Sequence, residues 1–495
     1  MITLPNECYY IVFNNLRHNY KNLFSCALVN RQWCRIIIPI LWSEPTHYFE
    51  DIRLIRIFLL TLNAEEQSLL IPFKITLPSF PKPLFEYTSY ITSVNNYLYD
   101  GVENWLHYER YETGCKLENA IKCSLIAMFL RTSKNLKYLS LDEIICNQII
   151  FENLYENTNV TSVDLYTTND DFNSKSIDML TKILYKNFTL TFLKLTSNQL
   201  SSEEVKTLLE AIYKNIVLNS LDLYDNQIGV EGGKVLAKFL CKNITLTSLN
   251  IMSNNLGSEG GKALAGALCE NTTLTSLNLA YNNLESEGGK ALAETLCKNA
   301  TLTSLNLAYN KLGSEGGKAL ADALCKNTTL ISLNLYYNCL EPEEGKALAD
   351  ALCKNTTLTF LTLANNQLGS EGGKALANAL CKNTTLTSLN LASNKLGSEG
   401  GKALADALYK NTTLTSLNLR SNYLGPEGGK ALADALGNNI TLKDLDLYNN
   451  GLGSEGGKVL ANSLCKNTTL IFLNIQSNNI NFKLKSNNQN IEILQ

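Results

Sequence analysis

The stretch Leu274-Thr275-Ser276-Leu277-Asn278-Leu279-Ala280-Tyr281-Asn282-Asn283-Leu284 determines the fold, because its spacing of leucines and asparagine recurs every 28 residues. The frame L-x-x-L-x-L-x-x-N-x-L is repeated eleven times without a gap, from Leu190 to Ile480. Every copy keeps the asparagine, which occurs as Asn198, Asn226, Asn254, Asn282, Asn310, Asn338, Asn366, Asn394, Asn422, Asn450 and Asn478. Such a period predicts an array of stacked supersecondary units.

Each unit is expected to contain a short strand, a turn and a helix. Alternate leucines such as Leu389 and Leu391 would point to one side of the strand. Asn394, at the turn, could bond backbone groups of neighbouring units and so form an asparagine ladder. Ser398 is the expected N-cap of the helix that follows. The helix then presents a single apolar face, made in this unit by Gly401, Leu404, Ala405 and Leu408.

One unit cannot bury enough apolar surface to fold alone, so stability requires the stacking of successive units. Parallel strands on one side and bulkier helices on the other predict a curved α/β solenoid, a horseshoe with a strand-lined concave face. The pattern closely resembles leucine-rich repeats of the ribonuclease-inhibitor type. The resemblance covers residues 136–480, with about eleven regular units and one or two degenerate ones near Leu136 and Val160. It implies a binding surface but specifies no particular function.

Three strings that recur within the repeat have structural explanations. Gly-Gly-Lys at 260–262 resembles a phosphate-binding loop, but Ala263 replaces the required Ser or Thr, and the string recurs in almost every unit. It therefore marks the start of a helix. Asn-x-Thr strings, such as the one at Asn271, are expected to be helix-end asparagines followed by turn threonines. A cysteine at one helical position is expected to be a small buried hydrophobe: Cys241, Cys269, Cys297, Cys325, Cys353, Cys381 and Cys465.

The composition excludes several functional classes. The chain has 43 Lys+Arg against 46 Asp+Glu and a net charge of -3, which argues against a nucleic-acid partner. No apolar run approaches the roughly 18 residues of a membrane span. The N-terminus lacks the pattern of a secretory signal, so a cytoplasmic or nuclear location is expected. Cys-x-x-Cys is absent and histidine is confined to His18, His47 and His107, so no catalytic residue, metal or cofactor is expected.

Residues 1–45 contain no repeat and predict three short helices. Cys8, Val12 and Leu16 are expected to form one apolar stripe along the first helix. Three short helices make too small a core for independent stability, so such a module is expected to pack against a partner. The alternative is a helical bundle that only caps the solenoid.

The same segment resembles an F-box. The specific parts of the resemblance are the Leu4-Pro5 pair and the block at 26–33, which reads Cys-Ala-Leu-Val-Asn-Arg-Gln-Trp. Cys8 and Tyr9 stand where the family more usually has Ile and Leu. The family implies docking on a Skp1-type adaptor, and the residues expected to make that contact are Leu4, Pro5, Glu7, Val12, Leu28, Val29 and Trp33.

The segments outside the F-box-like region and the repeat are less regular. Residues 46–135 are interrupted by prolines and rich in aromatic residues, and we expect a helical and irregular linker that caps the N-terminal end of the solenoid. A helix is expected over residues 120–130. The polar tail, 481–495, is expected to be a thin C-terminal cap or a frayed end.

Partner recognition is expected where the concave face departs from the repeat, because most units carry only small Ser, Asn and Ala there. Tyr281, Tyr309 and Tyr337 share one position in three consecutive units and would form a contiguous strip, with Tyr336 beside them. A second, charged group lies near the C-terminal end and comprises Arg420, Tyr423, Asp444, Asp446 and Tyr448. Drift at exposed positions is the alternative explanation for both groups.

An F-box followed by a binding solenoid resembles the substrate receptor of an SCF-type ubiquitin ligase. The resemblance implies that residues 1–45 join a Skp1-type adaptor and a cullin–RING ligase, while the repeats hold an unknown target protein for ubiquitination. One alternative is an interaction scaffold that binds Skp1 without degrading anything. Another is a GTPase activator like the Ran activators that share the repeat, with Lys194 and Asp222 as the nearest candidate residues.

Overall fold

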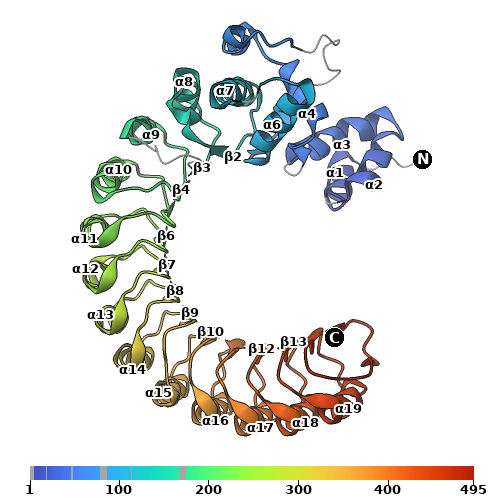
Figure 1. Ribbon diagram of the computed structural model, residues 1–495, viewed down its shortest axis with the longest axis vertical. Coiled ribbons are helices and arrows are strands. Elements are labelled where there is room, and N and C mark those ends of the chain that lie inside the picture. Colours follow the sequence, from blue (N-terminus) through green and yellow to red (C-terminus); the bar gives the residue numbers. More distant parts are fainter. Residues whose placement is uncertain (1–4, 18, 46–47, 78–85, 113, 167–173) are drawn as a thin grey trace. The chain divides into compact units, whose positions relative to one another are not determined.

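The structure is a computed structural model that describes residues 5–17, 19–45, 48–77, 86–112, 114–166 and 174–495 (Figure 1). The chain divides into two compact units. The first comprises Met1–Gln199 and Thr207–Asp222, and the second comprises Leu200–Lys206 and Leu223–Gln495. The division passes through helix α10 (Ser202–Lys214).

The first unit begins with helices and continues as an alternation of strands and helices. Its helices are α1 (Asn6–Asn14), α2 (Tyr20–Ala27), α3 (Arg31–Ser43), α4 (Ile52–Leu59), α5 (Ala64–Ser68), η2 (Ile71–Phe73), η3 (Tyr87–Tyr90), α6 (Tyr97–Glu109), α7 (Cys115–Thr132), η4 (Glu143–Cys146), α8 (Gln148–Glu156) and α9 (Ser174–Lys186). Its strands pair in parallel and in chain order: β1 (Ser93–Val94), β2 (Tyr138–Leu141), β3 (Ser162–Tyr166), β4 (Phe192–Thr196) and β5 (Ser220–Asp222).

From β6 to β14 the second unit repeats one strand and one helix every 28 residues, and β15 follows without a helix. Its strands are β6 (Ser248–Asn250), β7 (Ser276–Asn278), β8 (Ser304–Asn306), β9 (Ser332–Asn334), β10 (Phe360–Thr362), β11 (Ser388–Asn390), β12 (Ser416–Asn418), β13 (Asp444–Asp446), β14 (Phe472–Asn474) and β15 (Glu492–Leu494). Its helices are α11 (Gly229–Leu240), α12 (Gly257–Glu270), α13 (Glu285–Leu296), α14 (Gly313–Leu324), α15 (Pro342–Leu352), α16 (Gly369–Leu380), α17 (Gly397–Leu408), α18 (Gly425–Leu436) and α19 (Gly453–Leu464). Within this unit the strands line the inner side of an arc and the helices the outer side (Figure 1). The predicted α/β solenoid is confirmed.

The repeated asparagine forms the predicted ladder. Asn282 is fully buried, and its Nδ2 donates to the carbonyl oxygen of Ile251 in the preceding unit at 2.8 Å. Its Oδ1 accepts the backbone N–H of Asn254 at 3.0 Å. Asn310 repeats the pattern one unit later, where its Oδ1 accepts the N–H of Asn282 at 3.0 Å. Asn282 and Asn310 therefore satisfy backbone groups that a turn would otherwise leave unpaired. Asn254 does so only through its Nδ2, since its buried Oδ1 has no hydrogen-bond partner within the described part of the chain.

A second asparagine ladder follows the helices, and its links between units are additional to the helix-end role expected from the sequence. Asn271 donates from Nδ2 to the carbonyl oxygen of Leu240, a residue of the preceding unit, at 2.9 Å. Its Oδ1 accepts the backbone N–H groups of Thr273 at 3.1 Å and Leu274 at 2.8 Å. The Asn-x-Thr string therefore ends one helix, shapes the turn and bonds the neighbouring unit.

Glycine allows neighbouring helices of the second unit to approach closely. A Cβ atom at Gly261 would lie 2.8 Å from Cδ2 of Leu284 and 3.5 Å from the Cα of Gly288 in the next unit. The Gly-Gly pair at 260–261 is buried within α12, as expected of a helical packing face and not of a phosphate loop.

Two details of the repeat differ from the sequence-based expectation. Helix α17 begins at Gly397 with Leu396 at the N-cap and no side-chain cap, so Ser398 is a first-turn residue and not the cap. The repeated cysteines are not buried. Five are exposed and two are half-buried, and most of them follow the last residue of a helix on the outer side of the arc. The exposed ones are Cys241, Cys269, Cys297, Cys353 and Cys465.

Two short strands extend the parallel pairing beyond the recognisable repeat. In the linker, β1 pairs with β2 through Ser93 and Tyr138. In the polar tail, β15 pairs with β14 through Glu492 and Phe472. The linker also contains α7, which is longer than the helix expected over 120–130. The tail thus continues the sheet edge by one strand.

Candidate partner-binding surfaces

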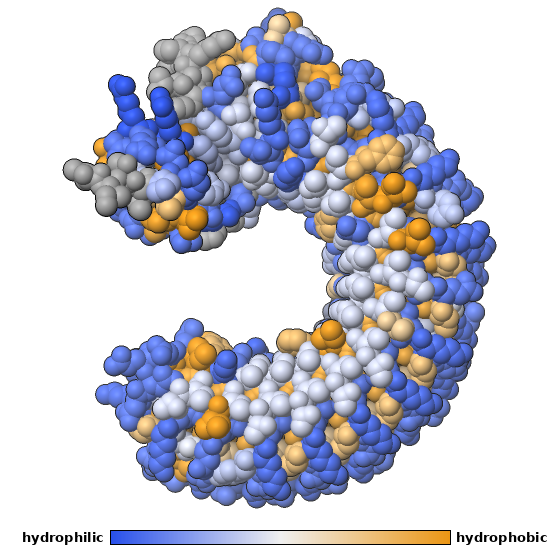
Figure 2. Space-filling view, turned by 180° about the vertical axis from the view of Figure 1, so that it is seen from behind, coloured by the Kyte–Doolittle hydropathy of each residue, from blue (hydrophilic) through white to orange (hydrophobic). Residues whose placement is uncertain are grey.

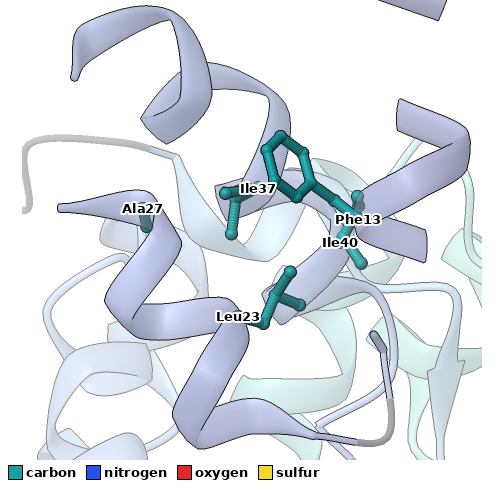
Figure 3. Packing of buried hydrophobic residues seen from close by; sticks show 5 residues of the cluster. All are labelled: Phe13, Leu23, Ala27, Ile37 and Ile40. Carbon is teal, nitrogen blue, oxygen red and sulfur yellow. The ribbon is translucent and has the colours of Figure 1, made fainter. Parts of the chain in front are cut away.

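The N-terminal helices α1, α2 and α3 pack into a small bundle. Its core consists of Phe13, Leu23, Ala27, Ile37 and Ile40, which point toward one another from the three helices (Figure 3). The Trp33 ring packs edge-on against the Phe13 ring, with 5.0 Å between their centroids, and tilts against the Tyr9 ring at 5.8 Å.

Local hydrogen bonds fix where these helices begin and how they join. Asn30 caps α3 by accepting the backbone N–H of Trp33 at 2.8 Å, and Asn19 caps α2 in the same way. Arg17, just after α1, forms an ion pair with Glu44, just after α3. The hydrogen bond to Glu44 raises the pKa of Arg17.

The apolar stripe predicted for the first helix is shifted by one residue. Tyr9, Phe13 and Leu16 face the core at i, i+4 and i+7, the spacing of one helical face. Cys8 and Val12 are exposed instead. The aromatic pair provides more apolar area to bury, and it determines which side of α1 faces α3.

The bundle exposes an unusual number of large apolar side chains. Six of the 22 large hydrophobic residues that are exposed in the described part of the chain fall between positions 10 and 29. Hydrophobic atoms are visible at the surface of these N-terminal helices (Figure 2). We call this set the apolar surface of the bundle; it comprises Tyr10, Ile11, Val12, Phe24, Leu28 and Val29.

The residues predicted to contact an adaptor lie in three environments. Val12, Leu28 and Val29 belong to the apolar surface of the bundle. Trp33 is half-buried against the core of the bundle. Pro5 and Glu7 are exposed at the start of α1. Leu4 lies outside the described residues. Their role in binding stays a prediction.

The tyrosines of the second unit form a stacked strip. The rings of Tyr281 and Tyr309 stack with 3.9 Å between centroids and 18° between planes. Tyr309 and Tyr337 stack at 4.7 Å and 23°. Tyr336 lies beside them, 5.0 Å from the Tyr309 ring centroid. The spacing follows from the distance between parallel neighbouring strands, which is about 4.8 Å.

These tyrosines occupy an unfavourable backbone conformation. Tyr281, Tyr309 and Tyr337 each have a positive φ, between 52° and 57°, in the left-handed region. Other units place Asn, Asp or Ser at this position, residues that tolerate the region better than a bulky ring does. The local backbone therefore does not explain why three consecutive units carry tyrosine.

The hydroxyl groups of the strip influence one another's pKa values. The pKa of Tyr309 is raised, chiefly by its hydrogen bond with Tyr281. The pKa of Tyr336 is raised by its hydrogen bond with Tyr309, and Asn365 donates from Nδ2 to the Tyr336 hydroxyl. The ring contacts and the bond from Asn365 thus hold the strip as a half-exposed aromatic surface.

The structure brings together part of the charged group predicted near the C-terminus. The Arg420 guanidinium lies over the Tyr448 ring, 4.1 Å from its centroid. Asp444 and Asp446 are on β13, and burial, followed by repulsion from Asp446, raises the pKa of Asp444. Tyr423 is 72% exposed.

Three observations on the described residues concern other kinds of site. No group of three or more His, Cys, Asp or Glu side chains there could hold a metal ion. None of the helices described is both long enough and apolar enough to span a membrane. Lys194, a candidate residue of the GTPase-activator alternative, donates to Asp164 Oδ2 at 2.9 Å, and its neighbour across the strands is Asp222.

Comparison with known proteins assigns the repeat to a family. The family described as Leucine Rich repeat matches ten segments: residues 186–208, 214–237, 242–265, 270–293, 298–321, 326–349, 354–377, 382–405, 410–433 and 438–461. No curated protein sequence matches the chain significantly.

Two solved structures resemble parts of the chain. The leiomodin-1 actin-binding site 2 has 27% sequence identity over 31% of this chain and 87% of its own, with a TM-score of 0.27. A chain of the Rad7 and Elc1 complex in yeast has 17% identity over 79% of this chain and 90% of its own, with a TM-score of 0.45. The ten family matches, together with the parallel strand–helix units that they cover, identify the chain as a leucine-rich-repeat protein.

Proposed function

We propose that this protein is a non-catalytic substrate receptor of an SCF-type ubiquitin ligase. The N-terminal bundle docks on a Skp1-type adaptor, and the leucine-rich repeats hold a target protein. A cullin–RING ligase bound to the adaptor then transfers ubiquitin to that target. This chain contributes only by holding the target close to the ligase, and we expect it to do so in the cytoplasm or the nucleus.

The observation that carries the proposal is the apolar surface of the bundle. A three-helix bundle of about 40 residues needs its apolar side chains for its own core, because so small a domain is only marginally stable. This bundle instead leaves six large ones in contact with solvent. Exposed apolar clusters on soluble domains mark interaction sites. Leu28 and Val29 belong to the block that resembles an F-box, whose family uses this region to bind the adaptor.

The docking role is tested by matching two equally exposed residues. Leu28 and Ile216 are each 72% exposed, but Ile216 lies outside the bundle. In the full chain, Leu28→Glu should weaken binding to a purified Skp1-type adaptor at least about tenfold, the equivalent of about 1.4 kcal/mol. Ile216→Glu should leave binding unchanged. Both variants should melt at the wild-type temperature, because neither side chain is in a core. Wild-type adaptor binding by Leu28→Glu would refute the docking surface.

A second measurement separates the receptor from the scaffold alternative. The full chain with the adaptor should also recover a cullin, because the receptor needs the ligase while a scaffold does not. Recovery of the adaptor without a cullin, under conditions where a known receptor recovers both, would favour the scaffold.

The target protein is expected on the tyrosine strip of the second unit. Tyrosine combines a large apolar ring with a polar hydroxyl, and it loses little conformational entropy on binding. In this strip the rings are already stacked before any partner arrives. Such preorganisation lowers the entropic cost of association.

A further inference from the structure

A polar pocket that no part of the proposed function uses lies in the first unit. It has a volume of about 630 Å³ and opens on the strand face opposite the buried leucines and valines. Strands β2, β3 and β4 and the segment after β1 line it, and the residues that matter here are Asn95, Tyr138, Asp164, Tyr166, Lys194 and Thr196.

Asp164 is the buried charge of this pocket. It is only 7% exposed. Its Oδ2 accepts two hydrogen bonds, from Lys194 Nζ at 2.9 Å and from the Tyr138 hydroxyl at 3.1 Å. Its Oδ1 has no hydrogen-bond partner among the residues that the structure describes. A buried carboxylate oxygen without a donor is costly, so this atom is a ready acceptor for a ligand.

Two further polar atoms of the pocket share this state. Asn95 Oδ1 and Thr196 Oγ1 are buried and lack a hydrogen-bond partner within the described parts of the chain. A carboxylate oxygen and an amide oxygen can only accept hydrogen bonds, while a hydroxyl can do either. Asn95 follows β1 and Thr196 is on β4, with two strands between them, so a single small group cannot reach both. A ligand that meets Asp164 Oδ1 must donate one hydrogen bond, and a ligand that also reaches Thr196 can donate a second.

The charge around the pocket favours a cation. The strand register places Asp164, Lys194 and Asp222 side by side on β3, β4 and β5, so Lys194 lies between two carboxylates, of which Asp164 belongs to the pocket lining. An anion would meet the Asp164 carboxylate, and Lys194 already donates to that carboxylate. The pocket also contains the aromatic side chains Tyr138 and Tyr166, and tyrosine faces attract cations.

We propose that this pocket binds the guanidinium group of an arginine side chain from a partner polypeptide. A guanidinium is a planar cation with five N–H donors, and it stacks on aromatic rings while it donates to carboxylate and carbonyl oxygens. Most of the lining side chains remain partly exposed, including Tyr138, Tyr166 and Lys194. The pocket can therefore hold the end of the arginine side chain while the backbone of the partner polypeptide stays outside it. This site stands independently of the adaptor contact and of the tyrosine strip.

The experiment is calorimetric titration of the full chain with N-acetyl-L-arginine methylamide. The matched compound with citrulline in place of arginine keeps the shape but has no charge, and it should bind at least about tenfold more weakly. Inorganic phosphate should not bind. Methylguanidine, which lacks the peptide backbone, should bind more weakly than the capped arginine. No binding of the capped arginine at millimolar concentration overturns the proposal, and equal binding of citrulline overturns the cationic ligand. Equal binding of methylguanidine overturns the polypeptide source.

Three substitutions test the geometry. Asp164→Asn replaces the acceptor and should weaken binding of the capped arginine at least about tenfold. Thr196→Val keeps the shape, removes one polar atom and should weaken binding severalfold in a chain whose melting temperature is unchanged; this variant serves even if Asp164→Asn fails to fold. Lys194→Met removes the competing cation and should strengthen binding. Weaker binding by Lys194→Met would instead indicate an anion site and would overturn the proposal.

Discussion

Replacing Asn338 with alanine should lower the stability of the second unit by an amount that follows from its hydrogen bonds. Asn338 is fully buried. Its Oδ1 accepts the backbone N–H of Asn310 at 3.1 Å and that of Leu312 at 3.4 Å. Its Nδ2 donates to the carbonyl oxygens of Leu307 at 2.9 Å and Tyr336 at 3.2 Å.

The variant does not leave all four backbone groups unpaired. The Leu307 carbonyl keeps the Nδ2 donor of Asn310 at 3.0 Å, and the Tyr336 carbonyl keeps the N–H of Tyr309 at 2.9 Å. The N–H groups of Asn310 and Leu312 lose the Oδ1 acceptor. One buried donor costs about 1–3 kcal/mol, and the longer bond to Leu312 adds less. The expected loss in unfolding free energy is about 2–4 kcal/mol.

Urea unfolding followed by circular dichroism measures this loss, and Asn378→Ala is the matched control. Asn378 is the same residue type, exposed on helix α16, and its replacement should change stability by no more than about 0.5 kcal/mol. Hydrogen exchange should show the amides of Asn310 and Leu312 exchanging faster in Asn338→Ala. Equal urea midpoints for the two variants, with no change in exchange at those amides, would refute the ladder as a source of stability.

Three further predictions concern packing, titration and recognition. Gly317→Ala should destabilise by about 1–3 kcal/mol in urea melts, because its Cβ would lie 2.7 Å from a neighbouring leucine methyl. Gly266→Ala, with nothing within 4 Å of the added Cβ, should stabilise by about 0.4–1 kcal/mol, and shifts of the same sign would contradict the packing argument. Burial raises the pKa of the Cys123 thiol from 9.0 to about 12, so the unfolded chain releases this proton at a lower pH than the folded chain does. The free energy of unfolding should therefore be unaffected by this group below pH 9.0 and should fall as the pH rises toward about 12. Cys123→Ala should reduce this fall in melts at alkaline pH, and an unchanged dependence of stability on pH would disprove the argument. Replacing Tyr281, Tyr309 and Tyr337 together with serine should lower recovery of the target protein at least about tenfold and leave the melting temperature within a few degrees of wild type. Undiminished recovery would place the binding site at the charged group around Arg420 instead.

The repeat itself could be predicted because its signal is local and redundant. Leucine spacing, the invariant asparagine and the glycine-rich helix start recur at one period, so strands, helices and their stacking follow together. The tyrosine strip was predictable for the same reason, since a shared position in consecutive units, such as Tyr281 and Tyr309, implies contact across parallel strands.

The features that the sequence did not predict depend on how different units meet. The second ladder, as at Asn271, requires knowing that its amide reaches a carbonyl of the preceding unit. The polar pocket forms where the degenerate units meet the first regular one: Asp164 and Lys194 are 30 residues apart and meet through the register of β3 and β4. In α1, either of two stripes was apolar enough to be buried, and the aromatic one, with Phe13, packed against α3.

Both asparagine ladders bond only adjacent units, and this makes the length of the array adjustable. Asn282 reaches back to Ile251 and Asn271 reaches back to Leu240, and neither bond spans more than one unit. Excising any 28 consecutive residues from the regular part would join two equivalent positions of the repeat, so the asparagine hydrogen bonds of both ladders could form across the junction. Chain length could then change in whole units without redesign of any interface, as long as the terminal strand β15 still covers the last one. The spacing between the tyrosine strip and the charged group around Arg420 would change in the same fixed steps.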